Sequence, residues 1–377
     1  MPNLTELFSR CADLYLKQIE FRNYRNLENS CFEPVKGINV IYGSNAQGKT
    51  NLIECIWLFT GGRSFRGSKE KEIIAFGKDK AFISASFNTE GRDQKLEISI
   101  EKGKRKASLN GIPRKYLSEI VGKFCAVVFS PDHLTLIKNG PDERRGFIDA
   151  AICQTDPMYA ARLSRYKKTL NERNNLLKSI LRNPSLRDTL SVWDEALADS
   201  GSKVAIERAK YIEKLCFPAV AFYDGISRGK EKMTLEYRMN CKAENRYDIG
   251  EIYEKTLLAL KNRHEEDILC GYTNSGVHRD DIVIKINGRD AKSFGSQGQQ
   301  RSAVLSMKLA EAAVLGKEKG ESPVILLDDV LSELDPSRQN FLLTKLSGMQ
   351  VFITCCEKNT YAENVICVSE GRITAEE

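Results

Sequence analysis

The feature that most constrains this chain is a glycine-rich loop, Gly43-Ser44-Asn45-Ala46-Gln47-Gly48-Lys49-Thr50. It has the pattern G-x-x-x-x-G-K-T, in which glycines let backbone N–H groups turn toward an anion. In such loops the lysine reaches the β- and γ-phosphates of a nucleoside triphosphate, and the threonine hydroxyl binds Mg²⁺. The sequence therefore predicts ATP binding by these eight residues and the adjoining Asn51, with Lys49 as a catalytic residue and Thr50 as a metal ligand.

The segments on both sides of this loop support that interpretation. Residues 38–42 are apolar and β-branched, which favours a buried strand. After the loop, Leu52, Cys55, Ile56 and Phe59 recur at helical spacing, so a helix N-terminus would face the phosphates. The alternative is a glycine turn that binds no ligand.

A second part of the same site is expected near the C-terminus. Val324-Ile325-Leu326-Leu327 is an apolar run that ends in Asp328 and Asp329. Asp328 would bind Mg²⁺ through water, and Asp329 would be the catalytic residue that polarises the attacking water. The alternative is that the two carboxylates cap the next turn.

A third motif precedes another expected helix. Ser293-Phe294-Gly295-Ser296-Gln297-Gly298-Gln299-Gln300-Arg301 leads into a segment with Val304, Met307, Leu309 and Ala312 at helical spacing. Ser296 and Gly298 would present a hydroxyl and N–H groups at a helix N-terminus, which suits a second anion. An N-capped helix without a ligand is the alternative.

Composition narrows the class of protein. The 377 residues suffice for two or three domains, and 57 Lys+Arg against 51 Asp+Glu give a net charge of +6, which permits nucleic-acid binding without requiring it. The 11 cysteines form no C-x-x-C pair, which argues against a disulfide framework or a zinc ribbon. A reducing cytoplasm fits best, and no run is long enough to cross a membrane. Residues 1–14 are expected to be a poorly ordered extension.

Periodicity divides the rest of the chain. Residues 15–21 alternate like a strand, residues 81–109 predict an antiparallel meander, and residues 124–129 read as the central strand of a sheet. The region from 141 to 217 is predicted to be helical, with its second helix ending before Pro218. Alternation returns at residues 233–239 and 282–286, with a helix at 252–263 between them.

Three basic segments are candidates for contact with DNA. Arg63 and Arg66 lie in a flexible loop and would touch the nucleotide, DNA or only solvent. Lys104, Arg105 and Lys106 crowd a hairpin turn, which suits phosphate contact but also an ordinary solvated face. The cations of the helical region are a further candidate surface.

Taken together, these motifs resemble the RecF family of SMC-like, ABC-type ATPases. Ser296-Gln297-Gly298-Gln299-Gln300 is similar to the ABC signature, and Ser332-Glu333-Leu334-Asp335 resembles the D-loop. Further matching segments are Tyr15-Leu16, Phe21-Arg22-Asn23-Tyr24-Arg25-Asn26, Gly62-Arg63-Ser64-Phe65-Arg66, Phe129-Ser130-Pro131-Asp132, Arg144-Arg145-Gly146-Phe147-Ile148-Asp149, Val192-Trp193-Asp194 and His278-Arg279-Asp280-Asp281. The distance from the phosphate loop to the signature is too long for a transporter ATPase and too short for an SMC protein.

The resemblance implies an α/β fold: an ABC-type P-loop ATPase head (residues 15–125 and 270–377), with a mixed sheet and an antiparallel meander, and a mainly helical arm (residues 126–269). It implies an ATP-dependent homodimer in which the signature residues act in trans on the partner's ATP. It also implies D-loop roles for Ser332 and Asp335 and positions near the nucleotide for Arg22 and Arg25. The signature residues are Ser296, Gln297, Gly298 and Gln299.

The same resemblance implies function and partners. Such proteins clamp double-stranded and gapped DNA in recombinational repair, hydrolyse ATP slowly with stimulation by DNA, and help load RecA together with RecR and RecO. ATP and Mg²⁺ are the implied cofactors.

The chain also departs from related patterns. Val277 stands where the family often has proline, and Thr354 follows the last core strand, where transporters carry a histidine. The sequence leaves the Q-loop and switch residues unassigned. His278-Arg279-Asp280-Asp281 invites an alternative hypothesis, an ABC-type ATPase with metal-dependent nuclease activity, although a structural role is favoured.

Overall fold

The computed structural model describes residues 12–356 and 363–376. Of the extension expected at residues 1–14, residues 1–11 lie outside that range, whereas Ala12–Asp13 form the short strand β1 and Leu14 is buried. The chain forms two compact units. One unit comprises residues 1–134 and 305–377, and the other comprises residues 135–304. The first unit is therefore built from both ends of the chain.

The core of the first unit is a mixed six-stranded sheet with the strand order β17-β16-β4-β15-β14-β9. Its strands run parallel except for the β16–β17 pair. Parallel strands covered on both faces are mostly apolar, as in Val324–Leu327 and in Ile38–Tyr42, where the one buried amide, Asn39, is hydrogen-bonded to Val35. The strands are β4 (Ile38–Tyr42), β9 (Ala126–Phe129), β14 (Val324–Leu327), β15 (Val351–Cys355), β16 (Asn364–Ser369) and β17 (Arg372–Glu376).

The prediction that the segment at 124–129 is a central strand is wrong. Among the described residues, β9 pairs only with β14 and so ends the sheet. All four residues of β9 are nevertheless buried. An unbroken apolar run indicates that both faces of a strand are covered, but it does not indicate how many strands pair with it.

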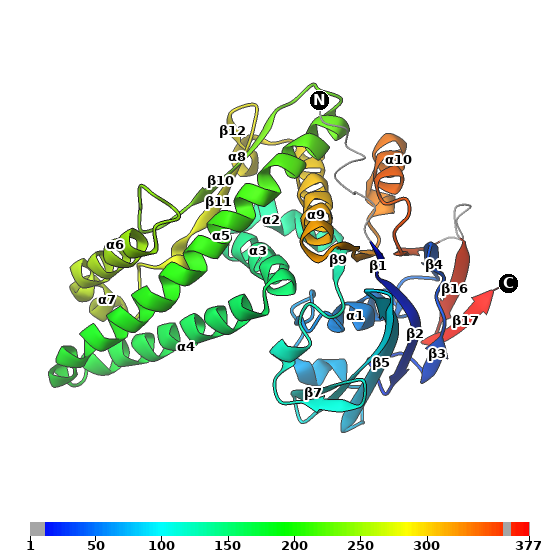
Figure 1. Ribbon diagram of the computed structural model, residues 1–377, viewed down its shortest axis with the longest axis horizontal. Helices are drawn as coiled ribbons and strands as arrows, with labels where there is room; N and C mark the ends of the chain where they lie inside the picture. Colours follow the sequence, from blue (N-terminus) through cyan, green and yellow to red (C-terminus); the bar gives the residue numbers. More distant parts are fainter. Residues whose placement is uncertain (1–11, 357–362, 377) are drawn as a thin grey trace. The chain divides into compact units, whose positions relative to one another are not determined.

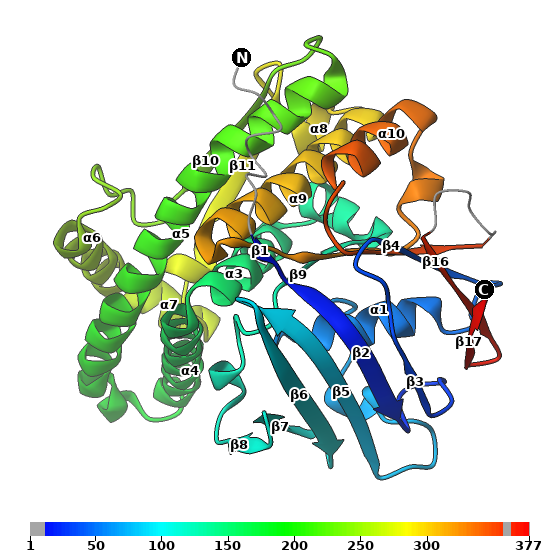
Figure 2. The same cartoon turned by 45° about the vertical axis from the view of Figure 1, so that its right-hand side comes forward.

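The second sheet of this unit is the expected antiparallel meander, with the order β3-β2-β5-β6-β7-β8 (Figure 2). The side chain of Gln350, which precedes β15, joins the two sheets. Its Oε1 accepts from the Leu16 N–H at 2.7 Å, and its Nε2 donates to Leu16 O at 2.9 Å and Val35 O at 2.7 Å. The strands are β2 (Tyr15–Arg22), β3 (Ser30–Phe32), β5 (Lys80–Thr89), β6 (Arg92–Glu101), β7 (Lys104–Leu109) and β8 (Ile112–Arg114).

Helices complete the first unit. α1 (Lys49–Leu58) buries almost all of its length, which suits a helix enclosed by both sheets, and α10 (Pro336–Lys345) follows the 3₁₀ turn Leu331–Glu333. Ala12–Asp13 (β1) pair in parallel with Glu321–Ser322 (β13). α9 (Gln297–Lys319) begins in the second unit and continues into the first.

The second unit is mainly helical, and its long helices α4 and α5 run side by side (Figure 1). The predicted end of α5 before Pro218 is wrong, because the helix continues to Ser227 with Pro218 buried inside it. Proline costs a helix interior about 3 kcal/mol, but Leu215, Ala219 and Phe222 are fully buried around it and together outweigh that cost. The helices are α2 (Thr135–Lys138), α3 (Pro141–Thr155), α4 (Pro157–Ile180), α5 (Leu190–Ser227), α6 (Ile249–Asn262), α7 (His264–Cys270) and α8 (Ala291–Phe294).

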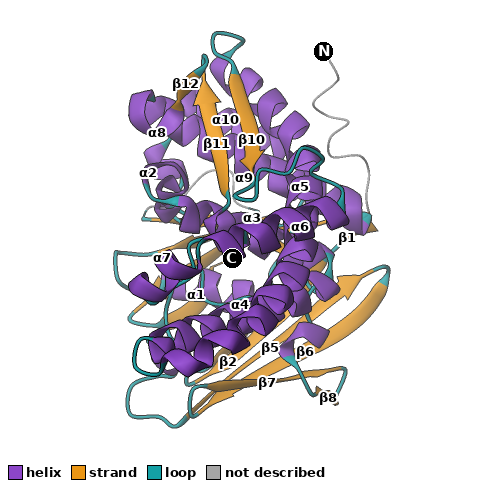
Figure 3. Cartoon of the chain, turned by 90° about the vertical axis from the view of Figure 1, so that its left-hand side faces the viewer, coloured by secondary structure: helices purple, strands orange, loops and turns teal. Residues whose placement is uncertain are grey.

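A small antiparallel sheet accompanies these helices (Figure 3). It contains β10 (Met233–Arg238), β11 (Asp281–Ile286) and β12 (Arg289–Asp290). The inward residues of β10 alternate with exposed ones, as the sequence predicted for this segment.

Candidate functional site

The glycine-rich loop connects β4 to α1 through backbone that favours glycine. Gly43 and Gly48 have φ of 154° and 117°. A Cβ on Gly43 would lie 2.2 Å from the backbone oxygen of Val368, and a Cβ on Gly48 would lie 2.6 Å from the Leu27 side chain. Both positions therefore require glycine for conformation and for space.

Lys49, the first residue of α1, is 4% exposed. Its ammonium donates to Gly43 O at 2.6 Å and to Ser44 O at 3.1 Å. Its Nζ also lies 3.9 Å from Cys356 Sγ. The cation is thus folded back over the loop, held by neutral acceptors that a phosphate would outcompete electrostatically.

Asp328, just after β14, brings three segments together. Its Oδ1 accepts from Thr50 Oγ1 at 2.9 Å and from Thr354 Oγ1 at 3.0 Å. Burial raises the pKa of Asp328, and the two hydroxyl hydrogen bonds oppose that shift. The carboxylate therefore lies where a cation would stabilise its charged form.

Asp329 occupies a left-handed conformation with φ of 52°. Its N–H donates to Thr354 Oγ1 at 2.8 Å. The Thr354 hydroxyl therefore contacts both acidic residues: it donates to the side chain of Asp328 and accepts from the backbone N–H of Asp329. The sequence identified Thr354 only as a departure from the transporter pattern.

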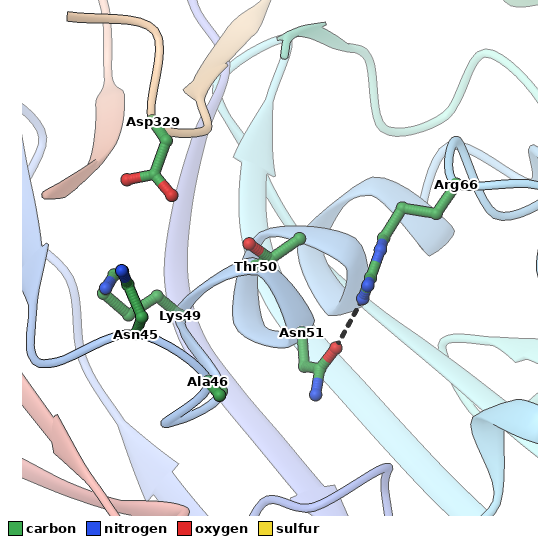
Figure 4. Close-up of a pocket in the computed structure, with 8 residues that line it drawn as sticks. Asn45, Ala46, Lys49, Thr50, Asn51, Arg66 and Asp329 are labelled. Carbon is green, nitrogen blue, oxygen red and sulfur yellow. Dashed lines mark hydrogen bonds between the residues drawn. The ribbon is translucent and has the colours of Figure 1, made fainter. Parts of the chain in front are cut away.

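Lys49, Thr50 and Asp329 line a cavity of about 240 Å³ (Figure 4). Arg66 lies at its edge, with Nη1 donating to Asn51 Oδ1 at 2.9 Å. Hydroxyl and carboxylate oxygens are the donors that Mg²⁺ prefers, so Thr50 and Asp328 fit that ion. The lining residues are Asn45, Ala46, Gly48, Lys49, Thr50, Asn51, Arg66 and Asp329.

The outer part of the loop has other contacts. Gln47 accepts from the Glu370 N–H through its Oε1. Asn45 Oδ1 accepts from Cys356 Sγ at 3.2 Å. Asn26, from the segment after β2, accepts from Asn51 Nδ2 at 2.7 Å, so it supports the first turn of α1.

Among the described residues, Arg22 and Arg25 do not line this cavity. Arg22 pairs with Glu20 and its side chain is 62% exposed. Arg25 forms two hydrogen bonds with the fully buried carboxylate of Glu54, at 2.9 and 2.8 Å. Arg25 thus neutralises a buried charge inside the fold.

The signature segment lies in the second unit at the start of α9. Ser296 and Gln299 form a reciprocal cap: the Gln299 N–H donates to Ser296 Oγ at 3.2 Å, and the Ser296 N–H donates to Gln299 Oε1 at 2.8 Å. Gln297 and Gly298 are the first two residues of the helix. The expected N-cap is therefore present, and the segment remains a candidate anion site.

The expected D-loop residues both have structural contacts. Ser332 Oγ donates to Asp329 O at 2.8 Å, which links this loop to the cavity. Asp335 caps α10 by accepting from the N–H groups of Ser337 and Arg338.

The basic candidates divide into exposed and buried residues. Arg63, Lys104 and Lys106 are exposed, whereas the side chain of Arg105 is only 4% exposed. Arg105 pairs with Glu70 at 2.9 Å and donates to Gly62 O at 2.6 Å. Its guanidinium is therefore unavailable to DNA in this conformation.

The His278-Arg279-Asp280-Asp281 segment lies in an internal network of the second unit. His278 Nδ1 is 2.6 Å from Tyr166 OH, the Tyr237 hydroxyl donates to Asp280 at 2.5 Å, and Arg144 pairs with Asp281 at 2.7 Å. In the described part of the chain, no group of three or more His, Cys, Asp and Glu residues has an arrangement that would hold a metal ion. These contacts favour the structural role.

Within the residues that the structure describes, no helix is long and apolar enough to cross a membrane. The described cysteines are all free thiols.

Comparison with known proteins places the chain in a family. Residues 15–370 match the model of the RecF/RecN/SMC N terminal domain. A "DNA replication and repair protein RecF" of Lachnoclostridium phytofermentans is 42% identical, covering 94% of this chain and 96% of that protein. Its counterpart from Clostridium acetobutylicum is 40% identical, covering 96% of this chain and 99% of that protein.

Solved structures agree with this assignment. Two structures of "the recombination mediator protein RecF", one with ATPrS and one with ATP, superpose with a TM-score of 0.92. They are 38% and 37% identical, and they cover 97% and 98% of this chain and 99% of each solved chain. An Smc head domain from Pyrococcus furiosus has a TM-score of 0.55 at 17% identity, which shows a shared fold. This chain belongs to the RecF family and has the fold of an ABC-type ATPase head with an inserted helical arm.

Proposed function

We propose that this protein is an ATP-dependent DNA-binding clamp of recombinational repair and replication restart. The observation that carries the proposal is a cavity lined by Lys49, Thr50 and Asp329, with Asp328 hydrogen-bonded to Thr50. It unites the cationic, metal-binding and acidic groups that phosphoryl transfer requires. The RecF relative with bound ATP supports ATP as the nucleotide.

The residues of the cavity have distinct proposed roles. Lys49 exchanges its two carbonyl acceptors for phosphate oxygens, which are stronger acceptors because they are charged. Thr50 and Asp328 hold Mg²⁺, which supplies charge neutralisation at the phosphates when it is bound. Asp329 orients and polarises the attacking water. The remaining loop residues bind the phosphates chiefly through backbone N–H groups.

The signature and D-loop residues are proposed to act between two subunits. The start of α9 offers N–H groups and the Ser296 hydroxyl at the N-terminus of a 23-residue helix, which favours an anion. We assign that anion to the triphosphate held by a second copy of the chain, so that ATP closes the dimer. Ser332 and Asp335 would lie near the same junction, because Ser332 contacts the backbone of Asp329.

DNA and protein partners follow from family membership. The solved relatives are described as recombination mediators in the RecFOR pathway, so we propose that this chain binds double-stranded and gapped DNA and works with RecR and RecO to load RecA. Bacterial DNA lies in the cytoplasm, which is the proposed place of action. ATP binding is the switch for DNA binding, and slow, DNA-stimulated hydrolysis resets it.

Calorimetric titration with ATP and Mg²⁺ tests the nucleotide site. Wild type is expected to bind one ATP per chain, and Lys49→Ala is expected to lose most of that affinity. Lys317→Ala on the exposed face of α9 is the matched control and should bind like wild type. Equal affinity of Lys49→Ala and wild type would remove the basis for the proposal.

A further inference from the structure

The fully buried carboxylate of Glu54, in the middle of α1, joins three segments of the first unit. Its Oε2 accepts from Tyr24 OH at 3.2 Å and from Arg25 Nε at 2.9 Å. Its Oε1 accepts from Arg25 Nη2 at 2.8 Å and from Ser64 Oγ. A buried carboxylate is costly unless it is paired and hydrogen-bonded, so these three partners constrain one another.

Ser64 passes this constraint to the loop that follows α1. Its side-chain oxygen donates to Glu54 and accepts from the N–H groups of Arg66 at 3.2 Å and Ser68 at 3.4 Å. Ser64 is 7% exposed. The Ser64 hydroxyl is therefore bonded both to the Glu54 carboxylate and to two backbone N–H groups. These bonds fix the turn over residues 64–68.

The first part of the same loop is held separately. Arg105, from β7, donates to Gly62 O at 2.6 Å, and the Trp57 indole donates to Arg63 O at 2.7 Å. Both anchors are buried side chains of the first unit. The loop therefore leaves α1 along a fixed path before it reaches Ser64.

The course of this loop places Arg66 at the phosphate cavity. It lines the cavity and donates to Asn51 Oδ1 at 2.9 Å, while Asn51 donates to Asn26 Oδ1 at 2.7 Å (Figure 4). A guanidinium at this edge faces the place where phosphate oxygens would lie.

We propose that Ser64 and Glu54 are positioning residues that hold Arg66 in place to contact the phosphates of the bound nucleotide. The inference deepens the proposed function and rests on it. Neither Ser64 nor Glu54 lines the cavity, and Ser64 contacts the backbone N–H of Arg66, so both residues act through the backbone of Arg66. A preorganised arginine loses less conformational freedom on binding, which strengthens its contact with an anion.

A double-mutant cycle of Ser64→Ala and Arg66→Ala tests the proposal, with ATP affinity measured by titration in Mg²⁺. Each single change is expected to weaken binding about tenfold, as for the loss of one charge-assisted contact. The double variant should be no weaker than Arg66→Ala alone, because Ser64 acts only through Arg66. Ser64→Thr keeps the hydroxyl and should restore affinity.

Ser68→Ala is the matched control, because it removes a hydroxyl from the same loop but keeps the N–H that Ser64 accepts. It should bind ATP like wild type. Glu54→Gln is a second variant that weakens the same hydrogen bond, and it should show the same non-additivity with Arg66→Ala. A merely structural role for Ser64 would lower the melting temperature and leave the affinity unchanged.

Different outcomes would contradict the positioning role of Ser64 and Glu54 and the proposed ATP-dependent function. Wild type that fails to bind ATP would contradict the proposed function itself. Wild type that binds ATP as tightly as Arg66→Ala, or additive losses in the cycle, would contradict only the positioning role.

Discussion

The hydroxyl of Thr50 donates to the carboxylate of Asp328 over 2.9 Å, although 278 positions separate them in the sequence. Thr50 is the second residue of α1, and Asp328 directly follows β14. Thr354, after β15, donates to the same oxygen. The strands β4, β15 and β14 are neighbours in the core sheet, so the segments at their ends place three oxygen-bearing side chains together beside the phosphate loop. A divalent cation and a triphosphate would meet at this corner.

Asp328→Asn tests the metal role of this corner. The change keeps the shape of the side chain but removes its charge, so ATP affinity should fall about tenfold in Mg²⁺ and hardly change in EDTA. Titration calorimetry under both conditions measures this. Asp248→Asn, which alters the cap of α6 outside the cavity, is the control. An equal loss with and without Mg²⁺ would contradict the metal assignment.

Asp329→Asn should separate binding from turnover. Asparagine tolerates the left-handed backbone at this position and keeps the N–H bond to Thr354, so the local fold should persist. Without the carboxylate, ATP hydrolysis should slow roughly a hundredfold while ATP affinity stays close to that of wild type. Phosphate release under single-turnover conditions gives the rate. Unchanged hydrolysis would show that another group polarises the water.

The basic hairpin should divide into one stabilising residue and two surface residues. Arg105→Ala leaves Glu70 partly buried without its partner, and the free energy of unfolding should fall by about 3 kcal/mol. Chemical denaturation measures this loss.

Replacing both Lys104 and Lys106 by Ala should leave stability within about 0.5 kcal/mol, since both are exposed. If this face contacts DNA, the double variant should weaken DNA binding and reduce the slope of log affinity against log salt by up to ~2. An unchanged slope would move the DNA surface elsewhere.

His278 should make the fold sensitive to acid. Burial lowers the pKa of His278 to about 4 from its ordinary 6.5, so the folded protein holds it neutral where the unfolded chain protonates it. Its contribution to stability is therefore present above pH 6.5 and is lost as the pH falls toward 4, with a total on the order of 3 kcal/mol.

His278→Asn removes this titration. The difference in unfolding free energy between wild type and variant should shift in favour of the variant as the pH falls from 7 to 4. Comparing two proteins cancels the opposite effect of Asp280, whose pKa burial raises to about 6. A difference that is constant with pH would contradict the assignment.

Much of the core was predictable because local patterns carried it. Short sequence patterns of a few residues each were enough to predict three features. These are the glycines of the phosphate loop, the largely apolar β4 and β14 strands, and the alternating meander. Family resemblance then supplied the pairing of the two halves, which lie at opposite ends of the chain. The antiparallel meander and the helical arm are confirmed by the fold.

The wrong predictions share one physical cause. Each depends on contacts between residues that are far apart in the sequence. The sequence of β9 does not indicate that, among the described strands, it pairs only with β14. The residues around Pro218 likewise do not indicate that Leu215 and Phe222 are fully buried, which keeps α5 intact. Arg105 looks like a surface cation until Glu70 and Gly62 are brought to it. The same holds for the hydrogen bonds that Glu54 accepts from Arg25 and Ser64.

The most direct test of the account is the mass of the protein in solution, measured by light scattering with and without ATP and Mg²⁺. Wild type is expected to be monomeric alone and dimeric with ATP. Ser296→Arg should remain monomeric because it fills the start of α9, whereas the control Ser185→Arg, on an exposed turn of the same unit, should dimerise. A wild-type protein that stays monomeric at saturating ATP would contradict the nucleotide-closed clamp.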